Sequence, residues 1–268
     1  MASEETKKED YQKCSEFIKK IIQQPVEEVF HTSISSCAIP RKIIQFWDSP
    51  NHIPNDVKSC MKSWDILQSS GYEYLLYNHD SAKEFIEYNL EEIHIEAFAK
   101  CTHPAMQSDY FRLCYISLKG GIYVDTDDVY LGNDINDLFM DNKLKIQPLC
   151  YDISTDSMIP PEIFTKENNH EKPWIFYFNN NPLIAPPHHT IIDKALERST
   201  ELLNKSNAFP LDIQSITGPG NLTKTIFSLS KEIDLSSQLT VMSNWKDIAE
   251  TRWELEYRTD SRNWRLIK

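Results

Sequence analysis

The pattern of hydrophobic and polar positions divides the chain into a short helical part and a longer mixed part. Between residues 11 and 22, apolar side chains recur at helical spacing, which predicts an amphipathic helix that ends before Pro25. From Ile39 onward, short runs of β-branched and aromatic residues alternate with amphipathic stretches of helical period. This alternation predicts an α/β fold in which helices flank a mainly parallel sheet.

The first half of the mixed part shows a regular succession of strands and helices. Asp80 is expected to be the N-cap of one helix. Pro104 fits the first turn of another helix, which ends at the pair Gly120-Gly121. We expect strands at 42–47 and 72–77, and helices at 54–69, at 82–89 and from Pro104 to the glycine pair.

The second half of the mixed part is less regular. A polar, proline-containing segment from about 150 to 175 is expected to form an irregular loop over a site. We expect strands at 175–178 and 239–242, a helix at 190–204, and a further helix that follows Thr217-Gly218-Pro219-Gly220 and ends at about Leu229.

The length of 268 residues suits one large domain. We find no repeat and no linker, so we expect a helical extension at 1–38 and one catalytic domain at 39–268. The first helix is more consistent with packing on this domain than with a membrane or partner contact, because its polar face is not basic. No segment reaches the roughly 18 apolar residues that a bilayer span requires.

Composition narrows the range of partners. A net charge of −12 disfavours nucleic acid and anionic membrane surfaces, so we expect at most peripheral membrane association. Only 6 glycines occur, and no Walker or G-x-G-x-x-G sequence is present. The 6 cysteines show no C-x-x-C pair, and the N-terminus has no apolar signal-peptide core. We therefore expect free thiols and a cytoplasmic location.

One block of the sequence carries the candidate chemistry. Asp109 and Arg112 are three residues apart on a predicted helix, so they share one face. A short predicted strand follows and delivers Asp125 and Asp127 to its carboxyl end, where α/β folds bind ligands. Carboxylate oxygens of this kind bind Mg²⁺ or Mn²⁺, which usually also contact a substrate phosphate. The block therefore predicts a metal-assisted site for a phosphorylated substrate.

The same block resembles a known family of enzymes. Ser-Asp-x-x-Arg, Gly-Gly, an aromatic residue and Asp-X-Asp stand here in the order and spacing of the sugar-binding-region glycosyltransferases, the family 32-like group. This family includes the yeast-type initiating mannosyltransferases and the catalytic domain of the clostridial glucosylating toxins. The resemblance implies a GT-A type fold and transfer of a sugar from a nucleotide-sugar donor.

The resemblance also implies roles for the acidic and basic residues. Asp127 would bind the metal directly and Asp125 would share it, while Arg112 would hold the diphosphate or a sugar hydroxyl. Asp109 would accept hydrogen bonds from sugar hydroxyls. Two structural alternatives stand beside these roles: a simple intrahelical pair between Asp109 and Arg112, and a turn or helix cap for Asp128.

Further candidates for the donor site lie at the ends of the first two predicted strands and near the C-terminus. In the resembled family, an aromatic at the position of Trp47 stacks on the base, although a core tryptophan is the alternative. The resemblance also implies a further metal contact at the C-terminus, for which Asp260 and Asn263 are the candidates beside the Asp-X-Asp pair. The remaining candidates for donor binding are Asn78, Ser108, Tyr123, Asn180 and Trp264.

The resemblance therefore implies a retaining hexosyltransferase that uses Mn²⁺ or Mg²⁺ and a UDP- or GDP-sugar. No carboxylate is marked as a nucleophile, so we expect front-face transfer rather than a covalent intermediate. The expected acceptor is a saccharide or lipid-linked saccharide of polysaccharide biosynthesis, with a protein acceptor of a toxin-like effector as the alternative. Other classes are a haloacid-dehalogenase-type phosphatase, whose strand ends in a similar acidic sequence, and a non-enzymatic nucleotide-sugar-binding module.

Overall fold

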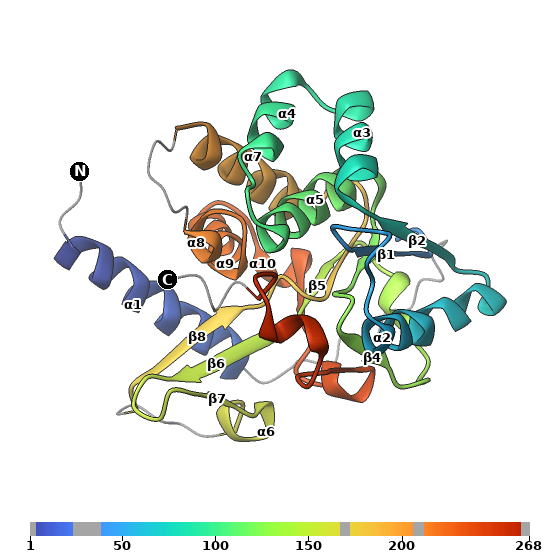
Figure 1. Ribbon diagram of the computed structural model, residues 1–268. Helices are drawn as coiled ribbons and strands as arrows, with labels where there is room; N and C mark the ends of the chain where they lie inside the picture. The colour runs from blue at the N-terminus through green and yellow to red at the C-terminus, as the bar shows by residue number, and fades with distance from the viewer. Residues whose placement is uncertain (1–3, 24–38, 167–171, 206–211, 264–268) are drawn as a thin grey trace.

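The computed structural model describes residues 4–23, 39–166, 172–205 and 212–263. In this part of the chain, strands and helices alternate around a central sheet of order β10-β5-β9-β3-β1-β2 (Figure 1). Three of its strand pairings are parallel and two are antiparallel. The predicted α/β class and the mainly parallel sheet are confirmed.

The strands fall into the central sheet, a three-stranded sheet of order β7-β6-β8 and a two-stranded ribbon of β4 and β11. Their bounds are β1 Lys42–Phe46, β2 Glu73–Tyr77, β3 Gly121–Tyr123, β4 Asp128–Tyr130, β5 Leu144–Ile146, β6 Pro148–Asp152, β7 Ser157–Ile159, β8 Trp174–Phe178, β9 Leu183–Ala185, β10 Leu239–Val241 and β11 Ala249–Thr251.

The described helices comprise long amphipathic ones and short turns between strands. The α-helices are α1 Glu4–Gln23, α2 Asn55–Asp65, α3 His79–Asn89, α4 Glu92–Ala99, α5 Pro104–Lys119, α6 Pro161–Phe164, α7 Thr190–Lys205, α8 Ile213–Ile216, α9 Pro219–Leu229 and α10 Leu235–Gln238. The 3₁₀ turns are η1 Ile66–Ser70, η2 Asn136–Phe139, η3 Trp245–Asp247 and η4 Glu256–Thr259.

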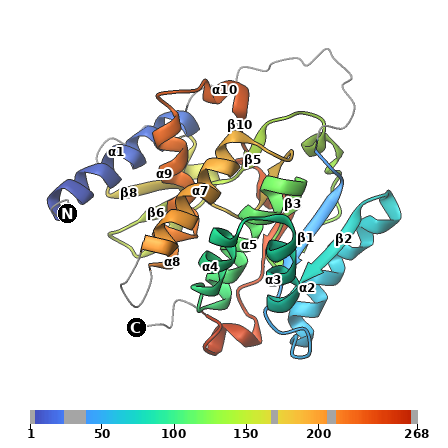
Figure 2. The ribbon, with the colours of Figure 1, turned by 90° about the horizontal axis from the view of Figure 1, so that it is seen from above.

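The central sheet separates two hydrophobic cores, because side chains along a strand alternate between its faces. On β1, Ile43 belongs to the core that contains Trp64 of α2, whereas Ile44 belongs to the core that contains Phe111 of α5. Figure 2 shows α3, α4, α5 and α7 grouped together, and Phe98 of α4, Phe111 and Ile191 of α7 lie in the Ile44 core. Burial on both faces explains the apolar runs at Ile43-Ile44 of β1, in β3 and in β9.

The prediction of an irregular loop at about 150 to 175 is wrong where the described residues form β6, β7, α6 and β8. The ends of this segment pair in the β7-β6-β8 sheet, where Cys150 lies opposite Phe176 and Ile159, and α6 follows. Cys150 and Phe176 are buried, so alternate apolar positions in a polar-looking segment are enough to build this sheet.

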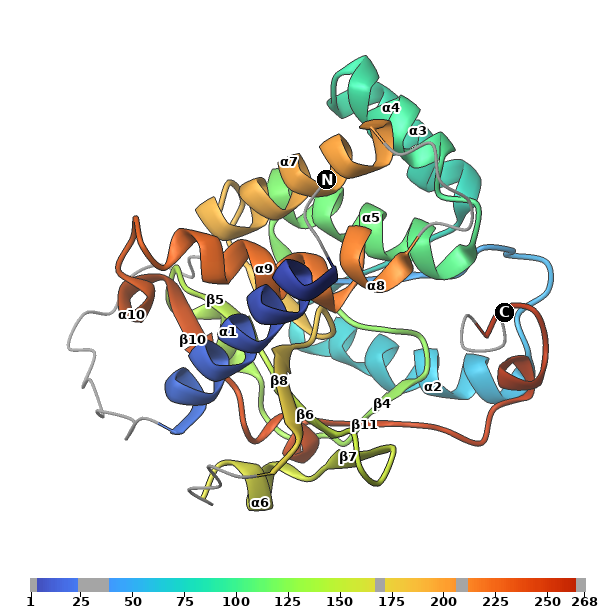
Figure 3. The same ribbon diagram turned by 90° about the vertical axis from the view of Figure 1, so that its left-hand side faces the viewer.

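The N-terminal helix forms as predicted and packs into the main core. Figure 3 shows α1 beside α9 and β8, and Ile18 and Ile22 are buried there. In the described residues, no helix is sufficiently long and apolar to span a bilayer. The predicted boundary at residue 38 lies outside the described residues, so the division into extension and catalytic domain stays a prediction.

Two local predictions need correction. The N-cap of α3 is Asn78 rather than Asp80, and the Asn78 side chain accepts hydrogen bonds from the backbone N–H groups of Asp80 and Ser81. The helix predicted at 54–69 changes to 3₁₀ geometry at Ile66 and ends at Gly71, which has a left-handed conformation.

The connection from α5 to β3 requires glycine. Pro104 begins α5, and Gly120 ends it with φ of +63°. Gly121 follows with φ of +112°, and a Cβ built there would lie 2.8 Å from the carbonyl oxygen of Lys42. The glycine pair therefore lets β3 lie against β1. As a result, the residues that follow β3 enter the pocket described below.

We expect Gly121→Ala to lower the free energy of unfolding by more than the roughly 1–3 kcal/mol of backbone strain alone. Gly132→Ala is the matched control, because Gly132 has φ of +89° but no heavy atom within 4 Å of the added Cβ. Urea unfolding of both variants measures the difference. Equal losses would show that the contact with Lys42 relaxes without cost.

Candidate active site

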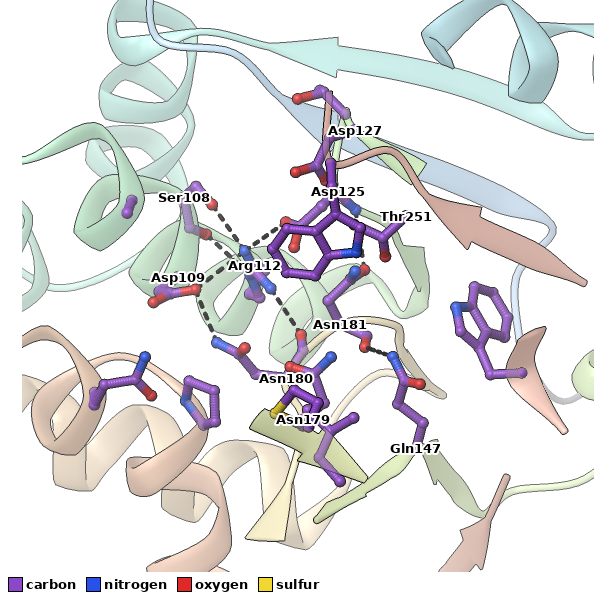
Figure 4. Close-up of a pocket in the computed structure, with 18 of the residues that line it drawn as sticks. Ser108, Asp109, Arg112, Asp125, Asp127, Gln147, Asn179, Asn180, Asn181 and Thr251 are labelled. Atoms are coloured by element: carbon purple, nitrogen blue, oxygen red, sulfur yellow. Dashed lines mark hydrogen bonds and ion pairs between the residues drawn. The ribbon is translucent and has the colours of Figure 1, made fainter. Parts of the chain in front are cut away.

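Side chains from both halves of the chain line one pocket at the carboxyl ends of β1 and β3. These strands are parallel neighbours, so the residues that follow Phe46 and Tyr123 emerge at the same edge of the sheet. The pocket has a cavity volume of about 550 Å³, which lies in the range of small-molecule sites. Figure 4 shows its polar centre, with Arg112 between Asp109 and Asp125.

Arg112 contacts most of the other polar groups of this centre. One guanidinium nitrogen (NH2) lies 2.8 Å from Asp125 Oδ1 and 3.0 Å from Asp109 Oδ1, and it also donates to the Ser108 hydroxyl at 2.8 Å. The other (NH1) donates to the Asn180 carbonyl at 2.8 Å. The pair of Asp109 and Arg112 is therefore part of a network that spans three segments, not only an intrahelical ion pair.

Asp109 is buried beneath this network. Burial raises the pKa of its carboxyl to about 6, although Arg112 opposes the shift. Asn180 Nδ2 donates to Asp109 Oδ1 at 2.8 Å, which selects Asn180 from the run of three asparagines as the one that contacts the helix. A hydrogen-bonded carboxylate and an amide at the pocket wall suit recognition of hydroxyl groups.

Asp127 is held by the C-terminal segment. Tyr257 donates its hydroxyl to Asp127 Oδ2 at 2.6 Å, and Arg258 forms an ion pair with the same oxygen. Burial and the charge of Asp125 raise the pKa of Asp127, while Arg258 and Tyr257 oppose the shift. Asp125 and Asp127 thus both line the pocket and repel each other.

Asp128 does not cap a helix, so that part of the prediction is wrong, whereas its backbone N–H closes a turn by donating to the Asp125 carbonyl at 3.2 Å. It begins β4, is fully buried, and accepts hydrogen bonds from Asn181 Nδ2 at 2.9 Å and from the Thr251 hydroxyl at 2.6 Å. Burial and the neighbouring carboxylates raise its pKa to about 7. Because Asn181 Oδ1 also accepts the backbone N–H of Asp125 at 3.0 Å, Asp128 helps to position the Asp-X-Asp segment.

The donor set fits a divalent cation. Three carboxylates, of Asp109, Asp125 and Asp127, pair with the guanidinium groups of Arg112 and Arg258, so this cluster has one more carboxylate than guanidinium group. Among the described residues, no three His, Cys, Asp or Glu side chains gather as a complete metal centre. Asp125 and Asp127 would therefore hold a cation that takes its other ligands from a phosphate and water.

Trp47 is a buried core tryptophan, and its stacking on a base stays a prediction that its place in the pocket lining allows. It lies in a small core with Val57, Met61 and Leu255, and it also lines the pocket. The Arg262 guanidinium lies over its ring at 5.3 Å from the centroid.

The structure brings most of the predicted site residues together, but not all. Tyr123 and Asp260 do not line the pocket: Tyr123 donates its hydroxyl to Ser108 under Arg112, and Asp260 pairs with Arg262. Asn78 also lies outside the pocket lining, as the α3 cap, and Trp264 lies outside the described residues. The predicted residues that line the pocket are Trp47, Ser108, Asp109, Arg112, Asp125, Asp127, Asn180 and Asn263.

Sequence reasoning missed Asn181, Thr251, Tyr257 and Arg258. Asn181 and Thr251 are 53 and 123 residues away from Asp128 in the chain, so no local spacing links them. The run of three asparagines gave a signal for Asn181, but nothing comparable marks the other three.

Comparison with known proteins agrees with this geometry. The family described as "Glycosyltransferase sugar-binding region containing DXD motif" matches residues 54–145, which contain α5, β3 and the Asp-X-Asp segment. The initiation-specific alpha-1,6-mannosyltransferase of Saccharomyces cerevisiae is 29% identical over 102 residues, which cover 36% of this chain and 21% of that protein. The predicted resemblance to this family is therefore confirmed over the segment that carries the motif, and it supports glycosyl transfer.

A solved structure also resembles the chain. The PaToxG glycosyltransferase covers 86% of this chain and 80% of its own, with a TM-score of 0.49 and 13% sequence identity. Because this likeness is low, the fold assignment rests on the strand order and pairing described above.

Proposed function

We propose that this protein is a metal-dependent, retaining glycosyltransferase of GT-A type that uses a UDP- or GDP-sugar. The observation that carries the proposal is the network in which Arg112 joins Asp109, Asp125 and Asn180 beside Asp127 in one pocket. The family match over residues 54–145 supports it. The five described cysteines Cys14, Cys60, Cys101, Cys114 and Cys150 are buried free thiols, which is compatible with the cytoplasmic location that we also propose.

Each group has a definite part in such a reaction. Asp125 and Asp127 would hold Mn²⁺ or Mg²⁺, which when bound supplies Lewis-acid stabilisation of the departing nucleoside diphosphate. Arg112 adds rigid donors for charge that develops on the diphosphate. Asp109 and Asn180 orient sugar hydroxyls, and Trp47 offers an indole face to the base. Asp125 and Asp127 would hold the metal, and Asp109 is bound by Arg112 and Asn180, so we propose front-face transfer with retention.

The wall of the pocket at the three-stranded sheet suggests the acceptor. Leu149 and Tyr177 are paired on the outer face of this sheet, and both line the pocket together with Met158. The inner face is covered by α1, whereas Met158 and Ile175 are each 41% exposed. We propose that this apolar face binds the apolar part of a lipid-linked saccharide, consistent with polysaccharide biosynthesis.

The direct test incubates the protein with UDP- and GDP-sugars and alkyl glycosides, with Mn²⁺ or with EDTA. We expect consumption of one donor only with the cation, and a product whose anomeric configuration, read by NMR, matches that of the donor. An inverted linkage would overturn retention, and a trapped glycosyl-enzyme would overturn the front-face route. Hydrolysis of phosphate monoesters without transfer would point to a phosphatase instead.

The acceptor proposal predicts a dependence on chain length. We expect two of the additional methylene groups of an octyl chain to be buried on this face. At about 0.8 kcal/mol each, their burial should give the octyl glycoside a KM about tenfold below that of the methyl glycoside. Met158→Gln should remove most of this difference. Ile153→Gln is the control, because Ile153 is 57% exposed and does not line the pocket. Equal KM values for both glycosides in the unaltered protein would exclude an apolar acceptor site.

A further inference from the structure

Arg258 holds an unusual position in the pocket. It lies on η4 in the C-terminal strap, which we define as residues 252–263, and it pairs with Asp127. Its guanidinium carbon lies 4.4 Å from the ring centroid of Trp253 and 5.5 Å from that of Tyr257. Asn263 donates to the Arg258 carbonyl at 2.7 Å, so both the backbone and the head group are anchored.

One donor of this anchored side chain has no acceptor. In the described part of the protein, four buried side-chain atoms lack a hydrogen-bond partner, and Arg258 Nε is the one whose residue lines the pocket. A buried guanidinium N–H without an acceptor is costly, so such a group calls for an acceptor from a water, an ion or a ligand. An anionic oxygen is the natural acceptor for it.

The surrounding groups restrict what this ligand is. The carboxylate nearest to Arg258, Asp127, is already used by the NH2 group and by Tyr257. The site that we propose for the donor places a nucleoside diphosphate beside Asp125 and Asp127. Its phosphate oxygens are the anions that this pocket would receive next to Arg258.

We propose that Arg258 is a diphosphate-binding residue, whose guanidinium stays anchored on Asp127 and donates its buried Nε–H to a phosphate oxygen of the nucleotide. This inference rests on the proposed function. The C-terminal strap then contributes positive charge to the donor site, in place of the metal contact that the sequence predicted from Asp260, which is paired with Arg262.

The positive charge of Arg258 is part of the protein, so it should attract a nucleotide diphosphate even when no metal is bound. Nucleotide binding in the absence of metal therefore tests the proposal. We would titrate UDP and GDP into the full chain in EDTA and measure binding by calorimetry. We expect measurable metal-free affinity for one of them, which falls about tenfold or more in Arg258→Gln. Arg252→Gln is the matched control, because Arg252 is an exposed arginine of the same strap outside the pocket lining. It should change the affinity less than twofold.

The variant Arg258→Lys distinguishes the hydrogen bond from Nε–H to the phosphate from the positive charge that pairs with Asp127. Lysine keeps a positive charge for Asp127, so the strap should stay in place, but it lacks the Nε–H of the guanidinium. We expect an unchanged thermal unfolding temperature and an affinity in EDTA near that of Arg258→Gln. Wild-type affinity in Arg258→Lys, or no metal-free binding by the unaltered protein, would overturn this inference. Absence of UDP and GDP binding even with Mn²⁺ would instead contradict the proposed function.

Discussion

Replacement of Asp127 by Asn is expected to abolish Mn²⁺-dependent transfer and to leave the fold intact. The amide removes the negative charge that a cation needs, and we expect a loss of at least about 10²-fold in kcat. The amide oxygen still accepts hydrogen bonds from Tyr257 and Arg258, and relief of the repulsion with Asp125 offsets the loss of the ion pair with Arg258, so folding loses little. Donor consumption with saturating Mn²⁺, and circular dichroism on heating, measure the two effects.

The control for this substitution is Asp137→Asn. Asp137 lies exposed on η2 outside the pocket lining, so the same change of charge should leave transfer unaffected. Transfer at the wild-type rate by Asp127→Asn with saturating Mn²⁺ would remove the central role of the Asp-X-Asp segment. Loss of the folded state would show instead that Asp127 is mainly structural.

Replacement of Arg112 by Lys is expected to lower both activity and stability. A single ammonium group cannot reproduce contacts to Asp125, Ser108 and the Asn180 carbonyl from two different nitrogens. Buried partners left without a donor should cost about 1–3 kcal/mol in the free energy of unfolding. Asp125 also loses the contact that orients it, so we expect kcat to fall about 10²-fold or more.

Arg198→Lys provides the comparison for a structural arginine. Arg198 donates to the Ser215 carbonyl and to Asn221 Oδ1 from one nitrogen, and it does not line the pocket. We expect some loss of stability by urea unfolding and no change in kcat. If Arg112→Lys showed the same combination, Arg112 would be a structural residue rather than part of the donor site.

Local sequence signals were sufficient for the helix–strand unit that carries the motif. Pro104 at the start of α5, Gly120 at its end and the short apolar run of β3 each act through neighbouring backbone geometry. Asp109 and Arg112 share a helix face for the same reason. These features depend on residues a few positions apart, so they can be predicted from the sequence.

Predictions that depended on distant partners were less successful. The segment from 150 to 175 was expected to be a loop because its charges and prolines hide an alternation that only the pairing of β6 with β7 and β8 reveals. The capping role of Asp80 and the helix-cap alternative for Asp128 were wrong for a similar reason. Several short polar residues near a helix or strand end can serve as the cap, and the geometry decides which one does.

The sequence by itself determined the chemical groups of this protein and their local order: a helix with Asp109 and Arg112, a glycine turn, and a strand that ends before Asp125 and Asp127. These follow from backbone propensity and from the periods of helices and strands. Only the tertiary structure decided which residues surround that unit, because Asn181, Thr251 and Arg258 reach it through chain segments that no spacing rule relates. Their burial next to the carboxylates sets the charge balance and the pKa values of the site, and burial is a property of the packed fold.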